Sequence, residues 1–89
     1  MKIFRKQPKD RLDYDILFHR WMPKGDAIAS VDIDTPEGIT FVGSSNTEDA
    51  VKVWVRGGES GNSYPFALRI TTEQGRIKEV DFMIVVVEI

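Results

Sequence analysis

Apolar and polar residues alternate with a period of two along most of this 89-residue chain. Successive side chains of a β-strand point to opposite faces, so the alternation predicts half-buried strands rather than amphipathic helices. Six strands are expected from the alternation and the turn residues, at 12–18, 27–34, 39–42, 50–56, 64–72 and 77–89. The basic arm at 1–11 forms either a further edge strand or a loose arm, because Pro8 is confined to edges and turns.

One side of each long strand carries the residues expected in the core. The expected inward residues are Leu12, Tyr14, Ile16, Phe18, Ala29, Val31, Ile33, Val51, Val53, Val55, Tyr64, Phe66, Leu68, Ile70, Thr72, Val80, Phe82, Ile84 and Val86. Ile28 is out of phase with its own strand, which predicts a β-bulge or a late strand start.

Glycine and proline mark the turns between these strands. Gly57, Gly58 and Gly61 supply positive φ between two strands, and another tight turn follows at 73–76. We therefore expect residues 50–76 to form the central hairpin of a sandwich, preceded by a polar loop at 43–49. Trp21 lies in a turn and is expected to plug one end. The predicted fold class is all-β, an Ig-like antiparallel β-sandwich of about seven short strands without significant helix.

Length and composition are those of one soluble domain spanning residues 1–89. Hydrophobic residues make up 42% of the chain and charged residues 29%, which argues against disorder. No apolar run approaches the roughly 20 residues of a membrane helix, so no membrane partner is expected. The first ten residues lack the apolar stretch of a signal peptide. The basic arm could contact nucleic acid, but the acidic net charge of −2 disfavours it.

Few residues carry chemistry. The chain has no cysteine and one histidine, His19, so neither a nucleophile–base pair nor a transition-metal site can be built from them, and no cofactor is expected. The loop at 57–61 ends without the lysine of a phosphate loop and leads into a strand. Two Asp-x-Asp pairs, Asp13/Asp15 and Asp32/Asp34, offer oxygen ligands for calcium or simply keep two strand faces hydrated.

The last strand is apolar on its outward side as well as its inward side. Met83, Val85, Val87 and Ile89 lie opposite the core phase, and Trp54, Pro65 and Ala67 are expected on the same outer side. A contiguous apolar outer face usually marks an interface. The expected interface residues are Trp54, Met83, Val85, Val87 and Ile89. The alternative is that the arm at 1–6 folds over this face, and an arm exchanged between subunits would combine both.

Several segments resemble a family of small phage and prophage structural proteins of the fiber–tail adaptor type. The resemblance covers nearly the whole chain and is carried by KQP followed by LDYD, by W-x-P-x-GD-x-I, and by V-x-VW-x-x-GG-x-x-G-x-x-Y ending in T-x-x-GR. The residues that match are Pro8, Tyr14, Trp21, Gly25, Asp26, Trp54, Gly57, Gly58, Gly61, Tyr64, Gly75 and Arg76. The segment at 83–87 departs from the pattern, because it is more apolar than a strand of such a protein should be.

The resemblance implies an Ig-like, non-enzymatic assembly module of the virion, at the head–tail or tail–fiber region. Its partners would be other virion structural proteins, with a homo-oligomer as a further expectation. It would be made in the bacterial cytoplasm from a prophage and then built into the particle. The alternative function is an accessory domain that binds carbohydrate or calcium.

Overall fold

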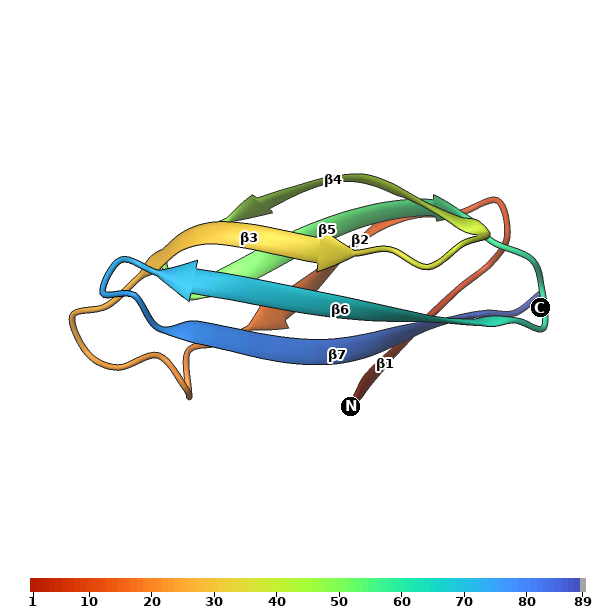
Figure 1. The fold of residues 1–89 in the computed structure, drawn as a ribbon. Helices are drawn as coiled ribbons and strands as arrows, with labels where there is room; N and C mark the ends of the chain where they lie inside the picture. The colour runs from red at the N-terminus through yellow and green to blue at the C-terminus, as the bar shows by residue number, and fades with distance from the viewer. Residues whose placement is uncertain (89) are drawn as a thin grey trace.

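The computed structural model describes residues 1–88, which form seven strands in two packed sheets (Figure 1). Sheet A contains four strands in the order β1-β7-β6-β3, and sheet B contains three in the order β2-β5-β4. The strands are β1 (Lys2–Lys6), β2 (Arg11–Leu17), β3 (Ile28–Asp34), β4 (Ile39–Asn46), β5 (Ala50–Gly57), β6 (Ser63–Thr72) and β7 (Ile77–Val86). The predicted all-β sandwich is confirmed, and residues 1–88 contain no helix.

The N-terminal segment is an edge strand, one of the two predicted alternatives. β1 runs parallel to β7, whereas the sequence predicts an antiparallel sandwich. Sheet A is therefore a mixed sheet. Phe4 points into the sandwich, where its ring centroid lies 4.6 Å from that of Tyr14 and 5.9 Å from that of Phe82. Because Tyr14 belongs to sheet B, this aromatic contact closes one side of the sandwich.

The core lies between the two sheets and follows the predicted inward phases of β5, β6 and β7. Val51, Val53 and Val55 are fully buried from sheet B. Phe66 and Phe82 face each other across β6 and β7, and their rings stack with centroids 4.9 Å apart. Burial of these side chains removes apolar surface from water, which is the main stabilising contribution in a domain without disulfides.

Two strands differ in detail from the pattern-based expectation. The expected bulge in β3 is present between Ile28 and Ser30, and it leaves Ala29 exposed while Ile28 is buried. Leu12 was expected inward, yet it is 39% exposed because it lies near the end of the edge strand β2.

The prediction that residues 50–76 form a central hairpin is wrong. β5 belongs to sheet B and β6 to sheet A, so the glycine-rich segment between them crosses from one sheet to the other instead of turning back within one (Figure 1). The turn at 73–76 does join two paired neighbours, β6 and β7. Alternation alone cannot distinguish a hairpin from a crossover, because both place the same side chains in the core.

β4 is also longer than expected. It continues to Asn46, whereas the pattern predicts a polar loop from Gly43 onward. Residues 43–46 pair with β5 beyond a bulge between Phe41 and Gly43. Their side chains are polar because β4 is an edge strand, where much of each side chain stays in water.

Candidate functional site

An apolar surface covers part of the outer side of sheet A. We call it the apolar face, and its residues are Met1, Ile3, Pro65, Met83 and Val85. Met83 stands in register with Ile3 on one side and with Pro65 on the other. Ile3 is 60% exposed and Met1 75% exposed, so the surface is accessible at the β1 edge.

A shallow hollow adjoins the apolar face. It is lined by Met1, Asp34, Thr35, Pro36, Pro65, Phe66, Ala67 and Asp81. Pro65 fits here without loss of a ladder hydrogen bond toward β3, because the β3 pairing ends at Ala67. Asp34 and Asp81 border the apolar face at the hollow, and Arg5, in register with Val85, borders it at the β1 edge. A charged border of this kind is the usual arrangement of an apolar contact region with a polar rim.

The N-terminal arm does not fold over this surface. It adds β1 to the edge of sheet A, so Ile3 enlarges the apolar face instead of covering it. Val87 continues the same side of the chain and is half-buried, with its N–H donating to the Lys6 carbonyl at 2.9 Å. Ile89, also expected at this interface, lies outside the described residues.

Trp54 does not lie beside Met83 and Val85 as predicted. It projects from the outer side of β5 in sheet B, whereas both apolar residues project from the outer side of sheet A. The sheets pack through their inner faces, so Trp54 lies on the opposite side of the molecule. The single contiguous interface expected from the sequence is therefore two separate surfaces.

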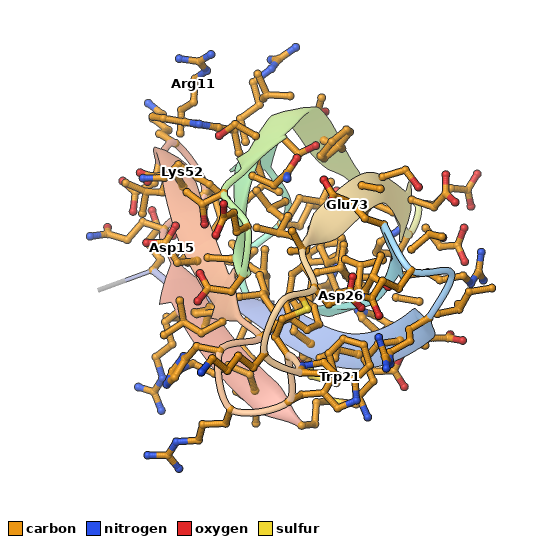
Figure 2. All side chains as sticks on the ribbon, turned by 90° about the vertical axis from the view of Figure 1, so that its left-hand side faces the viewer. Arg11, Asp15, Trp21, Asp26, Lys52 and Glu73 are labelled. Carbon is orange, nitrogen blue, oxygen red and sulfur yellow. The ribbon has the colours of Figure 1, made fainter. Side chains whose placement is uncertain are left out.

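The outer side of sheet B carries a charged cluster instead of an apolar one. Lys52 Nζ lies 3.1 Å from Asp13 and 3.8 Å from Asp15, and Figure 2 shows Lys52 and Asp15 on the β2 side of the molecule. The hydrogen bond to Asp13 is the main cause that raises the pKa of Lys52. One of the two Asp-x-Asp pairs is therefore engaged by a lysine. Within residues 1–88, no three metal-ligating side chains gather into a site.

Asp26 organises one end of the sandwich, where it contacts the β6–β7 turn (Figure 2). Its fully buried carboxylate accepts hydrogen bonds from the Arg76 guanidinium at 2.8 Å and from the backbone N–H groups of Ala27 and Gln74. Burial acts to raise the pKa of Asp26, but hydrogen bonds, the Thr72 hydroxyl first, outweigh it and lower that pKa overall. Two separate sequence motifs thus meet in one polar network.

Trp21 packs at this same end as predicted. It lies against the core with its ring centroid 6.5 Å from that of Phe18, and the Lys78 ammonium is 5.9 Å from its ring.

Tyr64 organises the opposite end. Its hydroxyl accepts a hydrogen bond from the Glu59 N–H at 2.8 Å, so the start of β6 is tied back to the crossover loop. A Cβ on Gly58 would lie 2.8 Å from Val86 Cγ2 and 3.1 Å from the Tyr64 ring, and Gly58 has φ +91°. Only glycine fits between these two side chains. A tyrosine that anchors the strand after a corner is typical of Ig-like sandwiches.

Lys6 is buried at this end too. Its ammonium donates to the carbonyls of Gln7 and Gly57 at 2.6 Å and 2.5 Å, which joins the end of β1 to the end of β5. Burial lowers the pKa of this lysine. Among the tyrosines, burial raises the pKa of Tyr14 to about 12, and its hydroxyl donates to the Arg5 carbonyl at 3.0 Å. These polar contacts are structural, because each joins two segments of the chain.

No helix among the described residues has the length and apolar character to cross a membrane. His19 is exposed in the turn after β2. The chain is thus a small all-β sandwich with an apolar surface on one outer side and a charged cluster on the other.

The chain belongs to the family described as podophage GP4 fiber-tail adaptor protein gp77, whose model matches residues 6–85. It is therefore a non-enzymatic structural adaptor of the phage virion, a tail component that binds other virion proteins. The matched region contains every family residue named from the sequence motifs, including Asp26, Tyr64 and Arg76. No curated protein matches the chain.

Proposed function

We propose that the chain performs its adaptor role by docking another tail protein onto the apolar face of sheet A. The single observation that supports this most strongly is the row formed by Ile3, Met83 and Pro65, which is apolar and accessible on the outside of the sandwich. Apolar residues at the centre of a protein surface, with charged residues at the border, resemble the core and rim of a protein–protein interface. Val87 extends the same surface.

A second copy of the chain is a further proposed occupant of the apolar face. A two-fold dimer would place Met83 of one copy near that of the other, because a two-fold interface uses the same patch on both subunits. The chain is proposed to be made in the bacterial cytoplasm from a prophage before it joins the particle. The absence of cysteine suits such a reducing compartment.

The test uses tails purified from a phage that lacks this gene, to which purified chain is added back. Met83→Glu places a charge at the centre of the apolar face and is expected to reduce binding to the tails by about tenfold or more. Leu17→Glu is the matched control, since Leu17 is 61% exposed on the outer side of sheet B. The proposal fails if the Met83→Glu variant binds tails as the wild-type chain does. Sedimentation of the free chain is a separate measurement, which decides whether a second copy occupies the apolar face.

A further inference from the structure

The two sheets expose four edge strands, and three of them are protected by charge. β1 carries Lys2 and Arg5, β2 carries Arg11, Asp13 and Asp15, and β3 carries Asp32 and Asp34. Charged residues on an edge prevent the addition of a further strand. β4, with the sequence ITFVGSSN, carries neither a charge nor a proline along its eight residues, and its pairing is interrupted only by the bulge between Phe41 and Gly43.

A hollow lies beside this uncharged edge, on the outer side of sheet B. It is lined by Arg11, Val42, Gly43, Ser44, Ser45 and Trp54. Gly43 stands in register with Trp54, and a Cβ built on Gly43 would meet nothing within 4 Å. The absent side chain therefore leaves open space between the edge and the indole.

Two arginines next to the hollow lack an acidic partner. Arg11 and Arg56 stand directly opposite each other on β2 and β5, a like-charge arrangement that is unfavourable by itself. Within residues 1–88 neither forms an ion pair, because Asp13 and Asp15 contact Lys52 instead. The Arg11 guanidinium lies 5.5 Å from the Trp54 ring centroid. The hollow is thus positively charged at one side and aromatic in its wall.

We propose that an acidic extended segment of another virion protein adds to β4 as a fourth strand of sheet B. Main-chain hydrogen bonds to the free edge supply affinity, and the hollow supplies specificity. An apolar side chain of the segment enters the space over Gly43 and packs on Trp54, while a neighbouring carboxylate pairs with Arg11 or Arg56. Sheet B then has as many strands as sheet A. This surface lies on the opposite side of the molecule from the apolar face, so the adaptor can hold two partners at once.

The test screens overlapping synthetic peptides that cover the tail and fiber proteins of the same phage. The wild-type chain is expected to bind a discrete acidic segment, more weakly at higher salt because an ion pair contributes. Gly43→Val should weaken binding by about tenfold or more, since valine fills the hollow. The fold should tolerate this change, because Gly43 follows the β4 bulge without a positive φ and has open space around it.

Three controls separate the mechanism from general damage. Arg56→Gln should weaken binding of the acidic peptide, while Arg69→Gln, a matched change on sheet A, should leave that binding unchanged. A peptide with a proline in its bound segment should lose affinity, because it cannot donate to the edge. Met83→Glu should leave peptide binding unchanged, because Met83 lies on sheet A. Peptide binding therefore tests the β4 edge independently of the proposal for the apolar face.

Four results would overturn the inference. The first is that no peptide binds. The second is that Gly43→Val binds the selected peptide as wild type does. The third is a dimer in sedimentation that Gly43→Val dissociates, which would assign the β4 edge to a second copy of the chain. The fourth is binding of a glycan from an array that Gly43→Val abolishes while no peptide binds, which would make the Trp54 hollow a carbohydrate site.

Discussion

Buried polar side chains hold both ends of the sandwich, and each joins segments that are distant in the sequence. Asp26 connects the turn before β3 to Arg76 after the β6–β7 turn. Lys6 connects the end of β1 to Gly57 at the end of β5. In the part of the chain that the structure describes, no buried side-chain polar atom is without a partner. Such satisfied groups specify one arrangement of the strands, because any other arrangement would leave them unpaired.

Asp26 also makes stability depend on acidity. The pKa of this carboxyl is lower in the folded state than in the unfolded chain, so the ionised group stabilises the fold fully above its unfolded pKa. That contribution is lost as the pH falls through the lowered, folded pKa. Asp26→Asn should therefore reduce the melting temperature most at neutral pH, with a smaller difference from wild type in acid. Thermal unfolding across pH measures this.

The control for this prediction is Asp32→Asn, at an exposed position on β3. Its melting temperature should stay close to that of wild type across the same pH range. A difference between Asp26→Asn and wild type that is the same at every pH would contradict the role assigned to the ionised carboxylate.

Gly58 tests the close packing around Tyr64. Gly58→Ala introduces a Cβ only 2.8 Å from Val86 Cγ2 at φ +91°, and should destabilise the fold by about 3 kcal/mol through both strain and overlap. Gly61→Ala has the same positive φ but open space around it, so only about 1 kcal/mol of backbone strain is expected. Denaturant unfolding compares the two variants. Equal losses would show that contact with Val86 and Tyr64 contributes nothing.

At the scale of elements, the sequence predicts which residues are strands better than it predicts which strands pair. The inward phases of β5, β6 and β7 follow from alternation, because core burial requires it. The crossover at 57–63 was mistaken for a hairpin, since glycines with positive φ serve both kinds of connection. The length of β4 was underestimated because polar residues on an edge strand look like a loop.

The candidate surfaces could be predicted only in part, because the sequence does not show which strands pair. Met83 and Val85 are recognisable from sequence as apolar residues on the wrong side of a strand. The separation of Trp54 from them depends on sheet assignment, which has no local signal. The sequence does hold a signal for the place of Ile3 on the apolar face. Alternation in the arm places Ile3 and Arg5 on one side of the strand and Lys2, Phe4 and Lys6 on the other.

β1 should stabilise the sandwich through one face only. Phe4→Ala removes contacts with Tyr14 and Phe82 and should cost about 2 kcal/mol, less than a fully buried phenylalanine because Phe4 is half-buried. Ile3→Ala, on the opposite face of the same strand, should change stability by no more than about 0.5 kcal/mol. Chemical denaturation checks both. Equal effects would mean that β1 is not docked in the register described.

At the scale of the whole molecule, the sandwich presents two outer sides of different chemistry. Sheet A offers an apolar surface with a charged border, and sheet B offers charged side chains around Trp54. A module with unlike surfaces on opposite sides suits a family of fiber-tail adaptors. The apolar segment at 83–87, unexpected for an exposed strand, is explained if that surface is buried in the assembled particle.

Photo-crosslinking in the assembled tail tests whether the apolar face contacts another virion protein. A photoreactive amino acid is placed at position 83 on the apolar face, and at position 17 on the outer side of sheet B as the matched control. On irradiation of purified particles, position 83 should form an adduct with another tail protein or with a second copy, and position 17 should form much less. Particles that contain the chain but yield no adduct at position 83 would show that the apolar face is not an interface in the tail.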